Sequence, residues 1–170
     1  MNIRKTTTHD RIPVAKVYRS VSGELETITR RSHEITETYI FSLLNKPDDQ
    51  IVSLVAEDDE GELMGVVHAC KNGLESYGHI LTDLTIIVRP EFQGKGVARA
   101  LGEAILRYVA ANRPDVWRLE MEARKEKTRL DIFLAAGFVT EGEIKNRIRN
   151  IDGSFADSVL LAWFNPNFEK

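Results

Sequence analysis

Apolar residues recur at every second position along much of the chain, a spacing that predicts β-strands. Seven segments are expected to be strands, over 3–8, 51–57, 63–69, 77–88, 117–122, 138–144 and 157–164. The segments 51–57 and 63–69 are apolar on both faces, which is typical of buried strands. Turn residues at Asp58–Gly61 and Asp152–Gly153 favour antiparallel pairing of the strands on either side.

Apolar spacings of three and four residues predict helices between these strands. From Arg11 to about Leu44 the pattern is helical but irregular, and Asp10 is the expected N-cap. A helix is also expected after Gly96, and it should end before Pro114.

A short helix is expected from about Leu130. Thr128–Asp131 resembles a capping box with Asp in place of Glu, and Gly137 suits the position just after the helix. The order of strands and helices predicts a mixed α/β or α+β fold.

Composition narrows the class of protein. A length of 170 residues is typical of one domain, and the net charge of −3 weighs against nucleic-acid binding. Cys70 is the only cysteine, which excludes an internal disulfide and a multi-cysteine zinc site, so we expect it to be a small apolar strand residue. Neither a signal core nor a membrane-length apolar run is present. We therefore expect a single cytoplasmic domain over 1–170, with no metal, nucleic-acid or membrane partner.

The segment Gln93-Gly-Lys-Gly96 lies where a predicted strand gives way to a predicted helix. Amide groups at a helix start bind anions, and glycines allow close approach of a phosphate, so the loop predicts a phosphate or diphosphate ligand. It is neither a Walker loop nor the Rossmann fingerprint, because Arg99 replaces the third glycine. Taken alone, a tight strand–helix turn explains the glycines equally well.

The surrounding sequence decides between these interpretations. Gln93-Gly-Lys-Gly-Val-Ala98 matches Gln/Arg-x-x-Gly-x-Gly/Ala and resembles the acyl-CoA loop of the GNAT superfamily of N-acetyltransferases. Val88-Arg-Pro-Glu-Phe-Gln93 resembles the approach to that loop. Leu119-Glu-Met121 and Leu134-Ala-Ala-Gly-Phe138 resemble the second half of the family.

This resemblance implies a strongly twisted mixed sheet of about seven strands with about four helices. It also implies a splay between the fourth and fifth strands that holds acyl-CoA, with a single N-acetyltransferase domain over 1–170. The backbone of Ile86, Ile87 and Val88 would pair with the pantetheine arm. The implied pyrophosphate loop comprises Gln93, Gly94, Lys95, Gly96, Val97, Ala98 and Arg99.

The resemblance further implies transfer of acetyl from acetyl-CoA to a primary amine, with direct attack in a ternary complex. The amine must first lose a proton. Glu120 is the first choice for the base, since it matches the glutamate of ribosomal-protein N-terminal acetyltransferases. Glu122 points the same way, and Asp83 and His79 are alternatives. A solvated strand face explains Glu120 and Glu122 equally well.

Two positions depart from the family pattern. Phe133 stands where the family often has a tyrosine that protonates the thiolate, and Glu126 stands where it has an asparagine in the coenzyme site. Tyr108, Tyr77 or water would then supply the proton, and Lys125, Lys127 or Arg129 would help to bind the coenzyme. Phe133 also keeps open an alternative, a CoA-binding regulatory or sensor module with little turnover.

The acceptor is expected against residues 20–45 and the hairpin 144–156, where the pattern is weakest. Acidic residues there could attract an amine, and basic ones could meet a carboxylate. A solvated helix face is the preferred explanation of the acidic residues, and a charged edge strand explains the basic ones equally well. These residues are Glu24, Glu26, Glu34, Glu37, Lys145, Arg147 and Arg149. A small molecule, an amino acid and a protein N-terminus all remain open, and the family resemblance raises the expectation of a homodimer.

Overall fold

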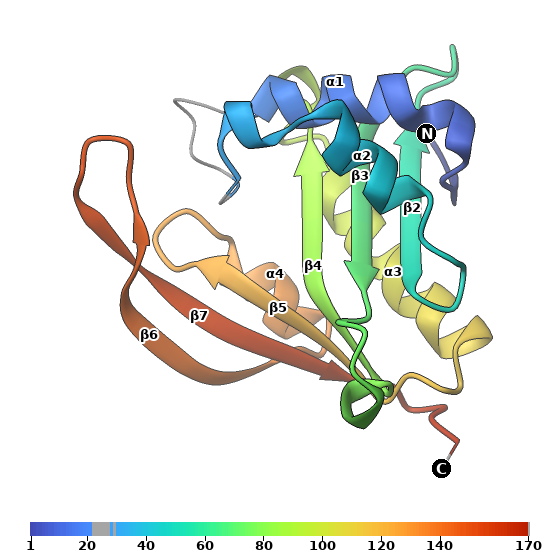
Figure 1. Cartoon of the computed structure of the whole chain (residues 1–170), viewed down its shortest axis with the longest axis vertical. Helices are drawn as coiled ribbons and strands as arrows, with labels where there is room; N and C mark the ends of the chain where they lie inside the picture. The colour runs from blue at the N-terminus through green and yellow to red at the C-terminus, as the bar shows by residue number, and fades with distance from the viewer. Residues whose placement is uncertain (22–27, 29, 170) are drawn as a thin grey trace. The chain divides into compact units, whose positions relative to one another are not determined.

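The computed structural model describes residues 1–21, 28 and 30–169. Within this part of the chain, seven strands form a mixed sheet in the order β1-β2-β3-β4-β5-β7-β6, together with four α-helices (Figure 1). The predicted fold class is confirmed. The strands are β1 (Asn2–Lys5), β2 (Ile51–Glu57), β3 (Leu63–Cys70), β4 (Ile80–Val88), β5 (Arg118–Arg124), β6 (Val139–Arg149) and β7 (Phe155–Phe164). The helices are α1 (Arg11–Val21), α2 (Glu37–Leu44), α3 (Val97–Asn112) and α4 (Leu130–Ala135).

The chain divides into two compact units. Unit 1 comprises Met1–His68 and Thr85–Ile105, and unit 2 comprises Ala69–Leu84 and Leu106–Lys170. The predicted glycine loop belongs to unit 1. The predicted bases and α4 belong to unit 2.

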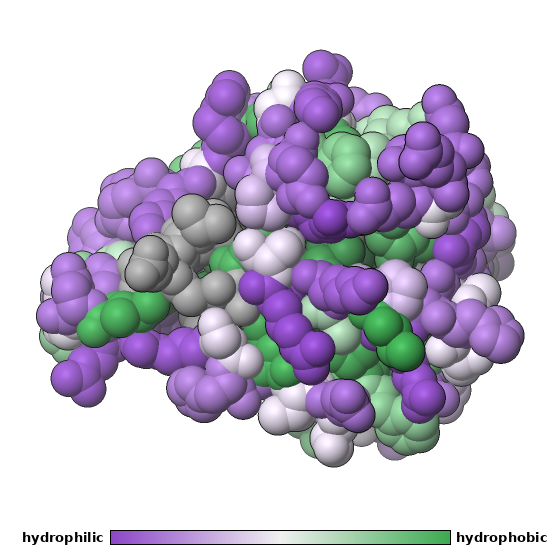
Figure 2. Space-filling view, turned by 90° about the horizontal axis from the view of Figure 1, so that it is seen from above, coloured by the Kyte–Doolittle hydropathy of each residue, from purple (hydrophilic) through white to green (hydrophobic). Residues whose placement is uncertain are grey.

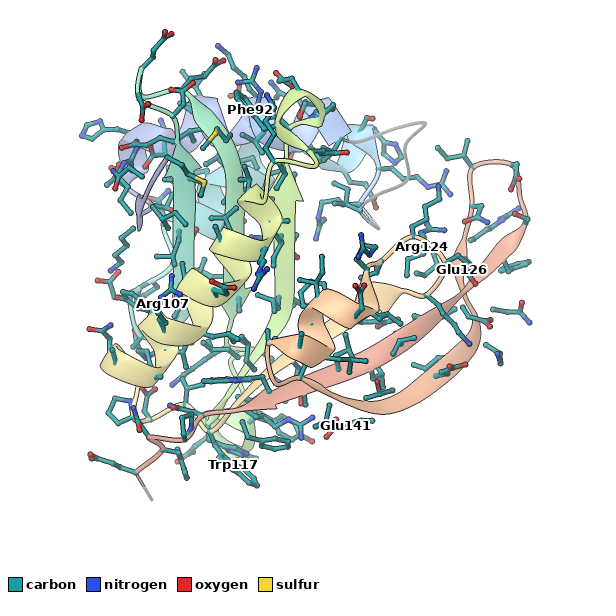
Figure 3. The ribbon with its side chains drawn as sticks, turned by 180° about the vertical axis from the view of Figure 1, so that it is seen from behind. Phe92, Arg107, Trp117, Arg124, Glu126 and Glu141 are labelled. Atoms are coloured by element: carbon teal, nitrogen blue, oxygen red, sulfur yellow. The ribbon has the colours of Figure 1, made fainter. Side chains whose placement is uncertain are left out.

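In unit 1, helices cover both faces of the strands β2 and β3 (Figures 1 and 3). His68 of β3 contacts Tyr18 of α1, whereas a Cβ at Gly65 would meet Leu101 of α3 at 3.1 Å. Because positions 65 and 68 have opposite parity, α1 and α3 lie on opposite faces of this strand. Strands β2 and β3 are buried almost throughout, as their apolar sequences predict.

In unit 2, the long β6–β7 hairpin pairs with β5 through β7. The helix α4 lies over these strands, and the position of a Cβ on Gly137 would be 3.6 Å from the Trp163 ring (Figure 3). Asp152–Gly153 forms the predicted hairpin turn, with Gly153 at a φ of 89°. The strand β6 continues to Arg149, five residues beyond its predicted end, through register irregularities that include Asn146 at a φ of 53°.

Two local predictions are wrong, whereas the helical segment 11–44 does contain helices. These are α1 and α2, which are separated by a 3₁₀ turn over Ser32–Glu34 and by residues outside the described set. Asp10 does not cap α1 from the N-cap position; it is the last residue of a 3₁₀ turn and accepts the Thr7 amide at 2.7 Å. The Thr128 capping box is also absent, since Arg129 is the residue before α4 and makes no side-chain cap hydrogen bond.

The fourth strand departs from its predicted pattern as well. It begins at Ile80, because Glu75–Tyr77 forms a 3₁₀ turn. Asp83 has a φ of 56°, which interrupts the alternation, so the buried residues on either side are Leu81 and Leu84. Strand β4 pairs with β5 in parallel at Ile80↔Arg118 and Leu81↔Leu119. The predicted splay between these strands stays a prediction.

Candidate functional site

The end of β4 approaches the glycine loop with its backbone fixed on one side by β3. Arg89 donates its amide to Met64 at 3.0 Å, and the Ile87 carbonyl would lie 2.6 Å from a Cβ at Gly65. Both groups therefore face β3. Because N–H and C=O groups of alternate residues point to opposite edges, those of Ile86 and Val88 face away from β3. The backbone of Val88 is thus directed to the strand edge that the sequence analysis assigns to pantetheine.

Gln93 joins the loop to this strand. Its side-chain amide donates a hydrogen bond of 3.1 Å to the Val88 carbonyl, and its backbone amide donates to Pro90 at 3.2 Å. The sequence analysis places Gln93 at the first loop position, and the side chain uses one donor to hold the loop start in place. Gln93 is therefore a positioning residue in this geometry.

Gly94 and Gly96 adopt φ values of 75° and 82°, a region that residues with a Cβ rarely occupy. A Cβ at either position would meet nothing within 4 Å, so the glycines are needed for the backbone turn and leave open space beside it. The loop passes directly into the 16-residue helix α3.

The amides from Gly94 to Arg99 form the electropositive start of α3. Outside regular helices and strands, none of the backbone hydrogen bonds among the described residues has its donor in this segment. The helix bond from Ala100 to Gly96, at 3.0 Å, is the one that follows it. Consecutive amides without backbone acceptors, at the positive end of a helix dipole, are suited to a diphosphate.

Two cationic side chains flank these amides. Lys95 lies with its Nζ 5.2 Å from the centre of the Phe92 ring, and Arg99 pairs with Glu103 at 2.9 Å. Arg99 is 74% exposed, so its head group is free to reorient toward an anion. Val97 is buried under the loop, whereas Ala98 is exposed.

Glu120, the predicted base, lies on β5 beside Arg118. The Arg118 Nε is 2.7 Å from Glu120 Oε1 without the alignment of a hydrogen bond, and Arg118 also pairs with Glu141. The Glu141 carboxylate, followed by Glu120, raises the pKa of the Arg118 guanidinium. Glu120 is half-buried in this cluster, and one of its oxygens contacts a cation.

The other predicted bases and acids of unit 2 occupy separate positions. Glu122 is on the same β5 face as Glu120 and pairs with Arg147 at 3.1 Å. Asp83 is exposed at the interruption of β4. The His79 ring stacks against Trp117 at 5.9 Å, which favours a packing role. Tyr108 is half-buried on α3, and its carbonyl accepts from Asn112.

Phe133 is held in the packing of α4. Its ring meets Phe138 edge-on at 5.7 Å, and its carbonyl accepts the Phe138 amide at 3.0 Å. The Gly137 amide donates to Leu134, and Gly137 has a φ of 96°, which completes the predicted glycine stop. Glu126 lies in the turn between β5 and α4, where Figure 3 labels it. Phe133 thus supplies an apolar surface and no proton.

The predicted acceptor segments are described in part. Glu24 and Glu26 lie outside the described residues. Glu34 is exposed at the end of the 3₁₀ turn Ser32–Glu34, and Glu37 is exposed at the start of α2. On the hairpin, Lys145 pairs with Asp157 at 2.8 Å. Figure 2 shows that hydrophilic side chains dominate the face of the molecule seen from above, with apolar residues in small, separate patches.

Two clusters of buried polar groups were missed in the sequence analysis. In unit 1, the Tyr18 hydroxyl lies 3.1 Å from His68 Nδ1 and 3.4 Å from the Tyr39 hydroxyl, and burial lowers the pKa of His68 to about 4. In unit 2, Arg124 and Ser158 are buried on neighbouring strands. A hydrophobic strand pattern hides an inward polar residue, so neither cluster leaves a periodic signal.

The described residues contain no group of three or more His, Cys, Asp or Glu side chains placed to hold a metal ion. The helices among them are all too short or too polar to cross a bilayer.

The region around the glycine loop matches a known protein family. The sequence profile of the acetyltransferase (GNAT) domain matches residues 49–140, which is more than half of the chain. Among curated proteins, none matches the sequence significantly.

Solved structures share the fold at low sequence identity. The protein yncA from Salmonella typhimurium, assigned as an acetyltransferase and solved with its cofactor acetyl-CoA, gives a TM-score of 0.86 at 14% identity, covering 100% of this chain and 96% of that chain. Ribosomal-protein-alanine N-acetyltransferase from Brucella melitensis gives 0.83 at 19%, covering 96% and 99%. A GCN5-related N-acetyltransferase from Kribbella flavida gives 0.82 at 19%, covering 96% of each chain.

Proposed function

Because the chain belongs to the GNAT acetyltransferase family, we propose that it transfers an acetyl group from acetyl-CoA to a primary amine. The observation that carries this proposal is the loop at Gly94–Arg99. Its amides lack backbone acceptors, its two glycines have positive φ, and open space lies beside them. These features fit the diphosphate of a coenzyme and give the loop a role beyond that of a turn.

The coenzyme would be held by the residues that the family resemblance assigned. Amides of Gly94, Lys95, Gly96, Val97, Ala98 and Arg99 would bind the pyrophosphate, with Lys95 and Arg99 adding charge. The backbone of Ile86, Ile87 and Val88 would bind the pantetheine arm, and the outward direction of the Ile86 and Val88 amides supports this assignment. The family resemblance also assigns Glu126 and Phe133 to coenzyme binding, and Phe133 would contribute an apolar contact.

The chemistry would proceed without a protein nucleophile. A base takes one proton from the substrate ammonium, and the neutral amine attacks the thioester carbonyl. A C–N bond forms, the C–S bond breaks, and CoA leaves as a thiolate that takes up a proton. The Val88 amide would polarise the carbonyl oxygen during the attack.

Glu120 is our first choice for the base, because it is a half-buried carboxylate on β5. Its contact with Arg118 would hold the carboxylate in a fixed orientation between turnovers. Glu122, Asp83 and His79 stand as alternatives. Tyr108, Tyr77 or water would protonate the thiolate, since Phe133 cannot.

A second function is favoured by one observation. The ring of Phe133 packs on Phe138 where many family members have a tyrosine acid, so a CoA-binding module with little turnover would also keep this packing. A thiol is an acceptable leaving group near neutral pH, since its pKa is about 8.5, and this favours the enzyme.

The release of free CoA thiol from acetyl-CoA tests the proposal. The purified protein is mixed with amines, amino acids and an N-terminal peptide, each with and without enzyme. Amine-dependent thiol release with formation of the acetylated amine supports an acetyltransferase. Binding of acetyl-CoA with no release above the background for every amine supports the sensor module instead.

A further inference from the structure

Arg124 is a nearly buried cation with no carboxylate partner. It ends β5, is 9% exposed, and donates Nη1 to the Asn150 side-chain oxygen, its only side-chain hydrogen-bond partner among the described residues. Arginine stays ionised in proteins, and a buried charge needs a counter-charge or strong hydrogen bonds. One neutral amide oxygen leaves most of the guanidinium donors unused.

Ser158 lies opposite Arg124 on the neighbouring strand β7. It is the β7 residue paired with Arg124 in the strand register, so the two side chains stand on the same face of the sheet. Ser158 is 0% exposed, and its Oγ has no hydrogen-bond partner among the described residues. A buried hydroxyl without a hydrogen-bond partner destabilises the fold. We therefore expect a bound ligand to supply the partner of the Ser158 hydroxyl.

The same face also carries the predicted base. Glu122 and Glu120 precede Arg124 by two and four residues on β5, so all three share one face. Neighbours on this face are about 7 Å apart along the strand. Glu122 and Glu120 have partners in Arg147 and Arg118, whereas Arg124 has no carboxylate partner in the described chain. Along this face of β5, the side-chain charges are therefore negative at Glu120 and Glu122 and positive at Arg124.

We infer that the acceptor is an amine that carries a carboxylate, and specifically a free α-amino acid. This inference rests on the proposed acetyltransferase function. The guanidinium of Arg124 binds the acceptor carboxylate, and the Ser158 hydroxyl donates to it. The acceptor amine then points along β5 toward Glu122, the nearer of the two carboxylates on this face. A peptide N-terminus has no carboxylate next to its amine, and a simple amine has none at all.

Apolar groups complete this face. Ile144 of β6 pairs with Ser158, and Leu160 is the next β7 residue on the same side, opposite Glu122. Both are half-buried. They would contact the acceptor side chain, while Arg124 and Ser158 recognise the part that all α-amino acids share.

The test compares acceptors that differ only in the carboxylate. L-alanine is compared with alaninamide and with an alanine-initiated peptide, and L-phenylalanine with phenethylamine, by thiol release at saturating acetyl-CoA. The variants are Arg124→Met, Arg124→Lys and Ser158→Ala. Lys5→Met removes one positive charge from β1, where the Lys5 side chain is 43% exposed, and serves as the charge-matched control.

We expect kcat/KM to be higher for the free amino acids. Arg124→Met should lower it about 10- to 100-fold for them, mainly through KM, and change it little for the carboxylate-free amines. Arg124→Lys should restore part of the loss, and Lys5→Met should have no selective effect. Ser158→Ala should raise Tm without acceptor and yet raise KM for the amino acids, a combination that a purely structural role would not produce.

Two results would overturn the inference while leaving acetyl transfer intact. The first is equal or better turnover of the amide, peptide or simple amine. The second is an Arg124→Met loss that is the same for both acceptor classes. If no acceptor turns over, thermal stabilisation of the CoA complex by the amino acids decides: its absence rejects the acceptor site. Failure of wild-type protein to bind acetyl-CoA would instead reject the proposed function itself.

Discussion

The side-chain amide of Gln93 donates a 3.1 Å hydrogen bond to the backbone carbonyl of Val88. This contact joins the start of the glycine loop to the last residue of β4. Two parts of the proposed coenzyme site, the strand edge for pantetheine and the amides for pyrophosphate, are thus held together by one side chain. The relationship makes the loop geometry depend on a residue that need not touch the coenzyme.

Gln93→Leu should weaken acetyl-CoA binding by about 5- to 10-fold, since a lost neutral hydrogen bond is worth about 1 kcal/mol. Leucine keeps the side-chain bulk and removes the donor. Isothermal titration calorimetry would measure the change, with Glu91→Gln as a neighbouring control. Unchanged affinity would show that the loop holds its shape without this hydrogen bond.

Gly96→Glu should abolish detectable CoA binding while the fold survives. The substitution places bulk and negative charge at the electropositive start of α3, and it strains a backbone with a φ of 82°. Gly73→Glu is the matched control, because Gly73 has a φ of 86° and equally open surroundings but no proposed ligand. Both variants should lose about 1–2 kcal/mol of stability. Retained CoA affinity in Gly96→Glu would refute the loop assignment.

The sequence made the strands, the glycine loop and α3 predictable, because each has a local signal. Buried apolar runs define β2 and β3, and the two glycines of the motif Gln93–Ala98 indicate a backbone with positive φ. The interruption of β4 at Asp83 was not predictable, since an aspartate with positive φ leaves the apolar pattern nearly unchanged. Helices were expected in segment 11–44, but the position of the break between α1 and α2 was not predictable, because apolar residues close to helical spacing continue along the segment.

If Glu120 is the base, Glu120→Gln should lower kcat and remove the pKa of the catalytic base from the pH–rate profile. Glutamine keeps the shape and the contact with Arg118 but cannot accept a proton. Glu122→Gln is the comparison on the same β5 face. An unchanged profile in Glu120→Gln, together with a changed one in another variant, would transfer the role to Glu122, Asp83 or His79.

His68 should make the folded state sensitive to acid. Burial lowers its folded-state pKa to about 4, against 6.5 in the unfolded chain. Above pH 6.5 neither state binds the proton, so this group costs nothing. As the pH falls from 6.5 to 4, the unfolded state takes up the proton first, and the free energy of unfolding drops by roughly 3 kcal/mol.

Urea denaturation of wild type and His68→Gln at several pH values measures this effect. The variant should be less stable at pH 7, because it disturbs the contact with Tyr18, but its stability should depend less on pH between 6.5 and 4. Asp10, whose pKa is lowered to about 2 mainly by Arg4, acts below this window. Parallel pH curves for the two proteins would show that His68 does not titrate on unfolding.

The buried polar groups were beyond sequence analysis for a physical reason. Arg124 sits at the end of a strand in which Arg and Glu alternate with apolar residues, and this pattern is typical of a solvated face. Its burial arises only when β5, β6 and β7 pair and bring Asn150 and Ser158 beside it. The proposed acceptor site therefore depends on the pairing of strands that are distant in sequence. The proposed coenzyme loop depends on local chain geometry.

A thermal-shift titration of the wild-type protein with acetyl-CoA, CoA, ATP and NAD, side by side, tests the central claim most directly. A ligand at about 100 times its Kd adds roughly 2.7 kcal/mol of stability, which raises Tm by several degrees for a chain of this size. We expect this rise with acetyl-CoA and CoA and little with ATP or NAD. No rise with the CoA species, or equal rises with all four ligands, would contradict an acyl-CoA site at Gly94–Arg99.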